Sequence, residues 1–325
     1  MILLLGATGL LGQNLLKMLL QQGRDVRVVV REGSSIDPSI LAEGPVDVIQ
    51  GSILNDTVLE RAVYGCKQVI NCAGVTDMSL SRPEDYRPIN TELPLRLAKA
   101  LDAVTGGVLV DVSSANTICP GTADSPSNED SPFGGPFTAS LYARSKRESE
   151  KLLLDFAQEH RFTRIVILLP GFMVGPYDSK PSSGKLLDAA YRKPVMPVPP
   201  GGKSFIDVRD VAAAAIGALD NPLAQGRYLT TGKAMTIKEF YQLQARVCGY
   251  SQTYVPLPRK LCLAVGGVGD RIEQNGRMTI ATSRNIRQLL VEECYDDSRA
   301  RTELGMPCTP LEQSIKDYFE YAARR

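Results

Sequence analysis

Short apolar runs rich in Val, Ile and Leu recur through the first half of the chain, and segments of helical periodicity separate them. The runs that predict strands are Ile2–Leu5, Val26–Val30, Val46–Gln50, Gln68–Cys72, Val108–Val112 and Arg164–Leu169. Apolar side chains repeat at helical spacing in 11–19, 93–101 and 152–156, as in helices that pack on a sheet. This alternation predicts an α/β fold, a Rossmann-type doubly wound parallel sheet with helices on both faces.

The pattern changes after Pro170. Residues 175–204 are rich in proline and glycine, which predicts loops with scattered short helices. Further on, the pattern predicts a helix at 210–220, a strand at 227–231 and helices at 236–248 and 310–323. We therefore expect a dinucleotide-binding domain at 1–170 that also takes in about 205–231. A smaller, interleaved C-terminal substrate lobe would comprise 171–204 and 232–325.

Composition narrows the class of protein. A chain of 325 residues corresponds to about two domains, and 43% hydrophobic and 22% charged residues are typical of a globular protein. Lys and Arg number 37 against 36 Asp and Glu, so no excess of cations is present to hold nucleic acid. No apolar run reaches about 20 residues, and none predicts a membrane span. The apolar start of the chain lacks the basic residues of a secretory signal.

The seven cysteines form no C-x-x-C pair, which argues against a zinc ribbon or a disulfide framework. Their odd number favours reduced thiols and a cytoplasmic location. The single histidine, His160, argues against a His-based triad or a metal site, and we expect it to be a surface cap near the end of a helix.

Three glycines, Gly6, Gly9 and Gly12, join the first strand to the first helix. Glycine at these places allows a sharp turn and brings backbone N–H groups and a helix N-terminus against a pyrophosphate. A dinucleotide site is favoured over a tight turn with no ligand because a strand precedes the loop and an amphipathic helix follows it. The predicted cofactor contacts in this loop are Gly6, Thr8, Gly9, Leu10, Leu11 and Gly12.

The second strand ends at Arg31, where NAD enzymes usually carry a carboxylate for the ribose hydroxyl. A guanidinium offers charge-assisted hydrogen bonds to a 2′-phosphate, so NADP(H) is favoured over NAD(H). In the alternative interpretation, Arg31 faces solvent and the neighbouring Glu32 binds the ribose.

Tyr142 and Lys146 are four residues apart at the start of a long predicted helix, so their side chains share one face. The preceding predicted strand ends in Ser113 and Ser114, at the carboxyl edge of the sheet where ligands of such folds bind. The alternative is that Tyr142 and Lys146 are ordinary surface residues of an amphipathic helix.

Five motifs follow one another along residues 1 to about 220: the glycine loop, residues 71–74, Ser113-Ser114, the Tyr142/Lys146 pair and residues 170–176. In this pattern the chain resembles the extended short-chain dehydrogenases/reductases. Within them it is most similar to the NAD(P)-dependent epimerase/dehydratase group and to the dihydroflavonol-reductase-like and 3β-hydroxysteroid-dehydrogenase-like enzymes. The likeness weakens toward the C-terminus.

The resemblance implies the roles of the site residues. Tyr142 would be the acid/base, Lys146 would bind the nicotinamide ribose and lower the tyrosine pKa, and Ser114 rather than Ser113 would hold the substrate oxygen. Asn90, at the start of a helix predicted at 90–104, would support a neighbouring loop or act as a plain N-cap. Further implied cofactor contacts are Ser52, Ile53, Ala73, Gly74, Pro170 and Met173. Ser52 departs from the aspartate usual in the family.

The sequence defines the residues that would bind the substrate less clearly than those that would bind the cofactor. Candidates near the predicted pocket are Thr76, Asp77, Phe172 and Tyr177. Four arginines in the C-terminal lobe would either bind the diphosphate of a sugar nucleotide or lie on solvated helix faces: Arg271, Arg277, Arg284 and Arg287. For the apolar segment around 259–269 we favour packing in the core over contact with a membrane.

These observations favour an NADP(H)-dependent reductase or dehydrogenase acting on a small carbonyl or hydroxyl compound. The resemblance also implies a homodimer, because enzymes of this family form dimers. The alternative within enzymes is a sugar-nucleotide epimerase or dehydratase with tightly bound NAD(P). The alternative of another class is a non-catalytic NADP-sensing regulator.

Overall fold

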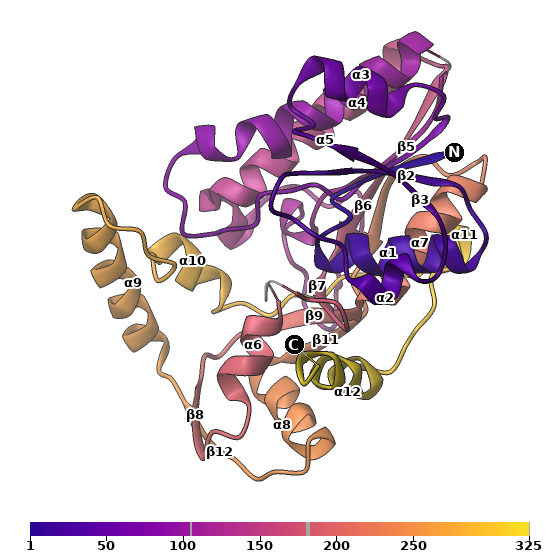
Figure 1. The fold of residues 1–325 in the computed structure, drawn as a ribbon. Helices are drawn as coiled ribbons and strands as arrows, with labels where there is room; N and C mark the ends of the chain where they lie inside the picture. Colours follow the sequence, from indigo (N-terminus) through magenta and orange to yellow (C-terminus); the bar gives the residue numbers. More distant parts are fainter. Residues whose placement is uncertain (105, 180–182, 325) are drawn as a thin grey trace.

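Seven parallel strands form the central sheet of the computed structural model, which describes residues 1–104, 106–179 and 183–324 (Figure 1). The strand order is β10-β6-β5-β4-β1-β2-β3. The strands are β1 (Ile2–Leu5), β2 (Val26–Val30), β3 (Val46–Gln50), β4 (Gln68–Asn71), β5 (Gly107–Val112), β6 (Thr163–Pro170) and β10 (Gly226–Thr230). The chain leaves β1 in one direction and returns at β4 in the other, so a topological switch point lies between them. The predicted fold class is confirmed.

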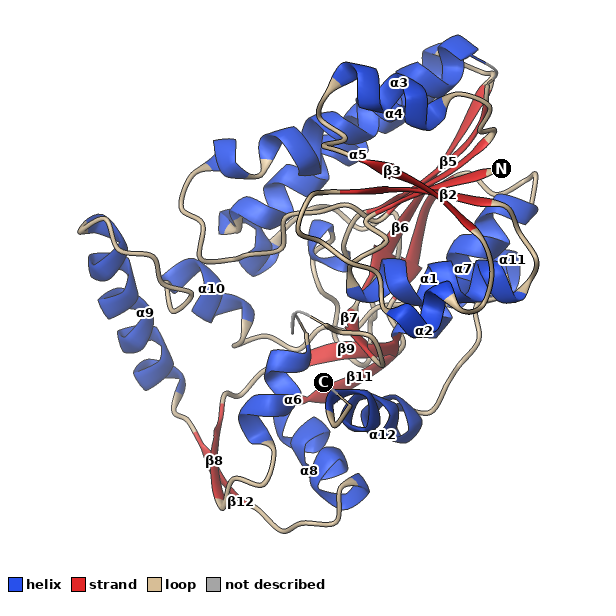
Figure 2. Cartoon of the chain, viewed as in Figure 1, coloured by secondary structure: helices blue, strands red, loops and turns tan. Residues whose placement is uncertain are grey.

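Helices cover both faces of this sheet (Figure 2). Because side chains alternate along a strand, Ile2 and Leu4 of β1 point to one layer and Leu3 and Leu5 to the other. The first layer contains α1 (Leu10–Gln21), α7 (Val208–Asp220) and α11 (Ser298–Leu304), with the short α2 (Pro38–Leu41) beside α1. The second contains α3 (Asp56–Val63), α4 (Leu93–Val104) and α5 (Leu141–Glu159).

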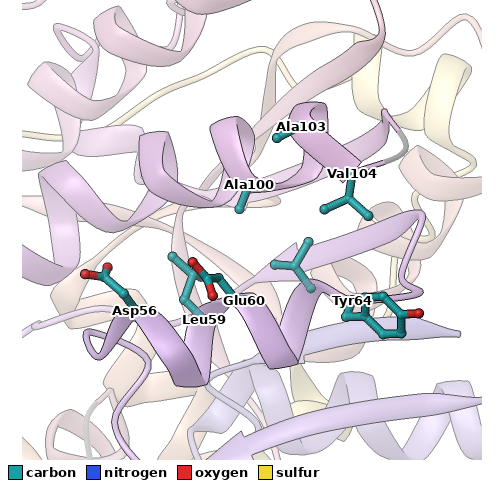
Figure 3. Close-up of a pocket in the computed structure, with 8 residues that line it drawn as sticks. Asp56, Leu59, Glu60, Tyr64, Ala100, Ala103 and Val104 are labelled. Atoms are coloured by element: carbon teal, nitrogen blue, oxygen red, sulfur yellow. The ribbon is translucent and has the colours of Figure 1, made fainter.

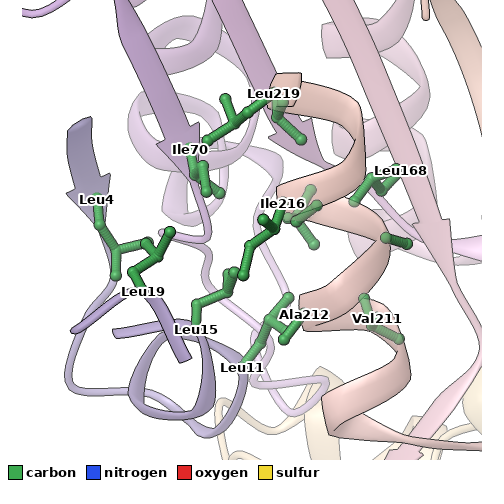
Figure 4. Packing of buried hydrophobic residues seen from close by; sticks show 14 of the residues in the cluster. Leu4, Leu11, Leu15, Leu19, Ile70, Leu168, Val211, Ala212, Ile216 and Leu219 are labelled. Carbon is green, nitrogen blue, oxygen red and sulfur yellow. The ribbon is translucent and has the colours of Figure 1, made fainter. Parts of the chain in front are cut away.

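The core of the first layer is formed by α1 and α7 against the sheet (Figure 4). Leu15 and Leu19 of α1 face Ala212 and Ile216 of α7, and all four are buried. Burial of this apolar surface is the main force that holds α1 in place. It therefore also fixes the glycine loop from which α1 begins.

A smaller lobe follows the sixth strand. It has a three-stranded sheet of order β11-β9-β7 and a two-stranded β12-β8 sheet, both with α6, α8 and α12 around them (Figure 1). Its elements are β7 (Phe172–Val174), α6 (Gly184–Ala190), β8 (Val195–Val198), β9 (Gly202–Asp207), β11 (Lys233–Thr236), α8 (Ile237–Val247), β12 (Thr253–Pro256) and α12 (Leu311–Ala322). The interleaved arrangement is confirmed, since β10 returns to the main sheet beside β6 between two parts of this lobe.

Two local predictions need correction. The segment 175–204 contains the expected short helix, α6, but also β8, which pairs with β12 more than fifty residues later and so has no local signal. The helix predicted from Asn90 starts earlier, as a π-helical turn at Arg87–Glu92 that runs into α4, so Asn90 is not an N-cap. Short 3₁₀ turns lie at Pro83–Asp85, Ala115–Thr117 and Gly135–Ala139.

The prediction that the segment around 259–269 packs in the core is also wrong. It forms α9 (Arg259–Gln274), which stands beside α10 (Ser283–Gln288). Leu261 and Val265 are 51% and 45% exposed, while the buried positions are Cys262, Gly266 and Gly269. Small residues let α9 approach its neighbour closely, so the glycine face packs and the larger apolar side chains point outward.

In the described part of the chain, no helix is long and apolar enough to cross a membrane. The same residues contain no cluster of three or more His, Cys, Asp or Glu that would hold a metal ion.

Candidate active site

The glycine loop lies against the segment that follows β4. Gly6 has φ +77°, and a Cβ at this position would lie 2.6–2.8 Å from backbone atoms of Cys72 and Ala73. A Cβ on Gly12 would lie 2.1 Å from the carbonyl oxygen of Gly6. Only glycine fits either position, because the neighbouring atoms are backbone and cannot move aside. The loops after β1 and β4 therefore meet at the switch point.

The N-terminus of α1 is exposed beside these loops. Gly9 is the N-cap, it has no side chain to satisfy the first amides of the helix, and a Cβ on it would meet only the Gly6 carbonyl oxygen, at 3.4 Å. Unsatisfied amides and the positive end of the helix dipole bind an anion. The space beside Gly9 and the helix terminus thus fit a pyrophosphate. Thr8, Leu10 and Leu11 lie in the same turn.

The candidates for the adenosine end lie on the loops after β2 and β3. Arg31 is exposed directly after β2, and among the described residues it forms no ion pair. Arg27 on β2 differs, since its guanidinium pairs with Asp47 at 2.7 Å. Ser52 is exposed and its hydroxyl accepts from the Leu54 amide, whereas Ile53 is buried.

Tyr142 and Lys146 lie in the first turns of α5, one turn apart, as the sequence predicted. Ser140 begins this helix, since its hydroxyl accepts from the Ala143 amide. The Lys146 side chain is buried, and its Nζ donates to the Val112 carbonyl oxygen at 2.7 Å. A Cβ on Gly74 would lie 3.7 Å from the same Nζ. Lys146 therefore joins the ends of β4 and β5 beside the glycine loop.

The two serines after β5 differ in their partners. Ser113 donates to the buried carboxylate of Glu150, two turns along α5 from the tyrosine. Ser114 accepts from the Asn116 amide at 3.2 Å, and within the described residues its proton has no acceptor. Glu150 was not predicted as a site residue. Its partner Ser113 lies 37 positions earlier, so local spacing carries no sign of the contact.

Asn90 supports the loop after β4, one of the two roles considered for it. Its Oδ1 accepts from the Val75 amide at 2.8 Å, and its Nδ2 donates to the Val75 carbonyl at 2.9 Å and to the Ser145 hydroxyl at 3.1 Å. These bonds connect the loop to the helix of Tyr142. The Asn90 side chain is fully buried, so the connection is shielded from water.

A buried carboxylate, Asp111, lies one residue before the Val112 carbonyl that Lys146 contacts. Its Oδ1 accepts from Asn71 Nδ2 at 2.7 Å, and its Oδ2 has no partner in the described residues. Burial raises the pKa of Asp111, and the nearby Lys146 opposes the rise. Burial also raises the pKa of the Cys72 thiol, and Asp111 adds to the effect, which disfavours the thiolate.

The four substrate candidates lie in different surroundings. Thr76 and Asp77 are exposed on the loop after β4, where Asp77 accepts from the backbone and side chain of Ser79. Phe172 is half-buried and packs edge-on against Phe205 at 5.3 Å. Tyr177 lies against α1: its hydroxyl accepts from Lys17 at 2.9 Å. The adjacent Thr76 and Asp77 therefore lie on the loop after β4, whereas Tyr177 lies against α1.

Tyr86 is a further residue of this region that sequence reasoning missed. Its hydroxyl donates to the Asp77 carbonyl oxygen at 2.6 Å. Burial raises the pKa of Tyr86 to about 12, so it stays neutral and fixes the loop. Pro170 and Met173 lie at the end of β6 and in β7, on the segment that leaves the sheet edge.

His160 ends α5 as the predicted surface cap, with its ring stacked on Phe156 at 4.1 Å and its Nδ1 2.9 Å from Asp102. A shallow apolar pocket of about 420 Å³ lies between α3 and α4 (Figure 3). Leu59, Val63, Ala100 and Val104 line it. None of the candidate residues lines this pocket, so it is separate from the site described above.

The sheet order, the glycine loop at the switch point and the Tyr142/Lys146 pair define an NAD(P)-dependent enzyme of the extended short-chain dehydrogenase/reductase type. The model of the NAD dependent epimerase/dehydratase family matches residues 2–230, and the chain belongs to this family.

Relatives within the family include reductases and epimerases. The chain is 28% identical over 321 residues to a putative dihydroflavonol 4-reductase of Synechocystis sp., covering 96% of this chain and 91% of the relative. It is 28% identical over 323 residues to sterol demethylase protein B of Methylococcus capsulatus, covering 97% and 96%. A solved structure, UDP-glucose 4-epimerase from Bifidobacterium longum in complex with NAD+ and UDP, has TM-score 0.77 at 21% identity and covers 100% of this chain and 98% of that one. This last likeness shows the fold alone.

Proposed function

We propose that this protein is an NADP(H)-dependent reductase or dehydrogenase that moves a hydride between the cofactor and a carbonyl or hydroxyl carbon. The observation that carries the proposal is the buried Lys146 ammonium at the end of β5, one turn from Tyr142 and beside Gly74. Among the described residues, the hydrogen bond of the buried Lys146 ammonium goes to a carbonyl oxygen, and a cation so placed is suited to binding a ribose hydroxyl and to stabilising a phenolate nearby. A surface role for the pair does not explain this burial.

In this mechanism the protein positions the substrate and transfers a proton. When bound, the nicotinamide cofactor supplies the hydride that reduces the carbonyl carbon. The Tyr142 phenol donates its proton to the carbonyl oxygen, and the positive charge of Lys146 favours the phenolate that remains. The Ser114 hydroxyl donates a hydrogen bond to the same oxygen. Ser113 is unsuited to this role because its proton is already bonded to Glu150.

The proposed cofactor contacts divide into three groups. The glycine loop, from Gly6 to Gly12 with Thr8, Leu10 and Leu11, holds the pyrophosphate. Arg31 binds the 2′-phosphate, with Ser52 and Ile53 at the adenine. Ala73, Gly74, Pro170 and Met173 line the nicotinamide half. Arg31 is exposed and forms no ion pair with any described residue, which supports NADP(H) because such a guanidinium is available to a phosphate.

For the substrate, we propose a site between the loop after β4 and the C-terminal lobe of residues 171–204 and 232–325. Thr76, Asp77 and Phe172 remain candidates for it. None of these three side chains is cationic, and Phe172 packs against Phe205. One relative is named as a putative dihydroflavonol 4-reductase, so a ketone of that class is the favoured substrate.

The second candidate is a sugar-nucleotide epimerase, which the structural neighbours favour through their fold. Such a pocket needs cations for a second diphosphate. Arg284 is already paired with Glu273 and bonded to the Leu80 carbonyl oxygen, which counts against its use for this purpose. A non-catalytic sensor would not need Tyr142 and Ser114, which are assigned to the reacting oxygen and not to the cofactor.

The proposed assembly is a homodimer, as in the family, and the proposed location is the cytoplasm, in keeping with seven free cysteines. Light scattering of the purified protein tests whether it is a homodimer.

The reaction is tested by following NADPH absorbance with the full chain and a panel of flavonoid and steroid ketones, with product analysis for UDP-sugars. Turnover of a ketone is expected. Conversion of a UDP-sugar with no net NADPH use would overturn the proposal.

A further inference from the structure

Helix α9 projects from the body of the molecule (Figure 1), and large apolar side chains on one face of it are exposed. Leu261, Val265, Val268 and Ile272 follow one another at intervals of four, three and four residues and so share one side of the helix. They are 38–55% exposed, and we call them the apolar stripe. Met278 and Ile280 continue it in the loop that follows, where they are 64% and 63% exposed. Six large apolar side chains thus face outward within twenty residues.

Close packing on another face of α9 fixes this orientation. Cys262, Gly266 and Gly269 each come one residue after a member of the apolar stripe, about 100° further round the helix. A Cβ on Gly269 would lie 1.9 Å from the Ala281 carbonyl oxygen, and one on Gly266 would lie 2.9 Å from Ser283 Cα. The backbone in front of α10 therefore touches the backbone of α9, and the helix cannot turn its stripe inward without losing this contact.

The charges around the stripe are also unevenly distributed. Residues 259–287 contain six basic and two acidic side chains, a net charge of +4 in a chain whose total is +1. Both acidic residues face α10: Asp270 accepts from the Ser283 amide at 2.8 Å, and Glu273 forms two bonds of 2.6 Å with Arg284. The remaining basic side chains are exposed: Arg259, Lys260, Arg271, Arg277 and Arg287.

Three of these cations flank the stripe most closely in sequence: Lys260, Arg271 and Arg277. None of the three forms an ion pair with a described residue. An apolar helical face bordered by free cations, with its acids turned away, matches the charge of an anionic lipid surface. A second copy of this face would bring like charges together, which disfavours self-association.

We propose that α9 and the loop to Ile280 dock on the surface of an anionic lipid bilayer. The apolar stripe would enter the boundary between headgroups and acyl chains, while the flanking basic side chains contact lipid phosphates. The helix would lie in the plane of the surface, because it is too short to span the bilayer.

The docking surface is connected to the candidate active site through α10. Asn285 donates to the Met78 carbonyl oxygen at 2.9 Å, and Arg284 donates to that of Leu80 at 3.1 Å. Both carbonyls belong to the loop of Asp77. If the proposed reductase function holds, docking would bring the substrate entrance to the lipid surface and suit a ketone that partitions into membranes. Docking itself does not require the reaction, so the two proposals fail separately.

The test is co-sedimentation of the full-length protein with vesicles of phosphatidylcholine alone and of phosphatidylcholine mixed with phosphatidylglycerol. We expect binding to the anionic vesicles that weakens as salt is raised. Val268→Glu places a charge in the stripe and should lower binding about tenfold or more. Lys260→Glu should lower binding to anionic vesicles with the stripe intact.

The matched control is Leu223→Glu, which makes the same type of change at an 84% exposed position outside this region and should bind as the unmodified protein does. Circular dichroism and melting temperature should be unchanged in all three variants, because every altered side chain is exposed. The proposal is overturned if the unmodified protein binds neither kind of vesicle, or if Val268→Glu and Leu223→Glu bind equally. It is also overturned if light scattering shows a dimer that only Val268→Glu dissociates.

Discussion

The Lys146 ammonium donates a 2.7 Å hydrogen bond to the carbonyl oxygen of Val112, the last residue of β5. This bond joins a helix to the edge of the sheet where Ser114 begins the next turn. Because the ammonium has three N–H donors, its other protons are left for partners on the side of Gly74. Two elements of the core, α5 and β5, thereby hold three predicted site residues: Tyr142, Lys146 and Ser114.

Replacement of the phenol is the most direct test of the mechanism. Tyr142→Phe removes the proton donor and keeps the ring, so kcat should fall by roughly 10²–10⁴ while cofactor affinity stays close to that of the unmodified enzyme. Steady-state kinetics and NADPH titration measure the two effects. Tyr64→Phe, at a 74% exposed tyrosine, is the control and should be neutral. Unchanged kcat in Tyr142→Phe would remove Tyr142 from the mechanism.

The two serines should separate catalysis from stability. Ser114→Ala should lower kcat with a small effect on the melting temperature. Ser113→Ala leaves the buried Glu150 carboxylate without its hydroxyl donor and should lower the free energy of unfolding by about 1–3 kcal/mol. Chemical denaturation and kinetics of both variants check this. The opposite pattern, with Ser113→Ala the more damaging to kcat, would exchange the proposed roles.

Two glycines of the first loop should also respond differently. Gly12→Ala places a methyl group 2.1 Å from the Gly6 carbonyl oxygen and should destabilise the fold. Gly9→Ala meets only one atom, at 3.4 Å, so stability should be largely kept while the methyl group obstructs the pyrophosphate. Thermal melting with and without NADPH distinguishes them. If Gly9→Ala retains full cofactor affinity, the pyrophosphate lies elsewhere.

Cofactor choice depends on Arg31 in the proposed site. Arg31→Ala should raise the KM for NADPH about tenfold or more and leave the KM for NADH nearly unchanged, because only NADPH carries the 2′-phosphate. Glu32→Gln is the matched control. If NADH is the better cofactor of the unmodified enzyme, or if Arg31→Ala affects both cofactors equally, the preference for NADP(H) is wrong.

Asp111 should make stability depend on pH. Burial raises its pKa in the folded state, so the folded protein binds its proton more tightly than the unfolded chain does. The resulting stabilisation is present below the unfolded pKa of about 3.9 and is lost as pH rises through the folded value. The free energy of unfolding of Asp111→Asn, relative to that of the unmodified protein, should therefore be higher at neutral pH than at acidic pH. Chemical denaturation at acidic and neutral pH measures this difference. An equal difference in free energy of unfolding at both would contradict the prediction.

Local patterns in the chain were enough to predict the parallel sheet, its strand positions, the glycine loop and the Tyr142/Lys146 pair. Each of these depends on local information. The signals are apolar runs that alternate with segments of helical periodicity, glycines at a turn, and two side chains one helical turn apart. Such features survive in almost any packing of the surrounding chain, so they can be recognised before the fold is known.

The folded arrangement was needed to learn which side chains already have partners and which surfaces are left uncovered. Ser113 is bonded to Glu150, Tyr177 is turned to Lys17, and α9 presents its apolar stripe outward. In each case the deciding contact joins residues that are distant in the sequence or depends on a backbone approach that only small residues permit. Periodicity shows that a helix has an apolar face, but the fold determines whether anything covers it.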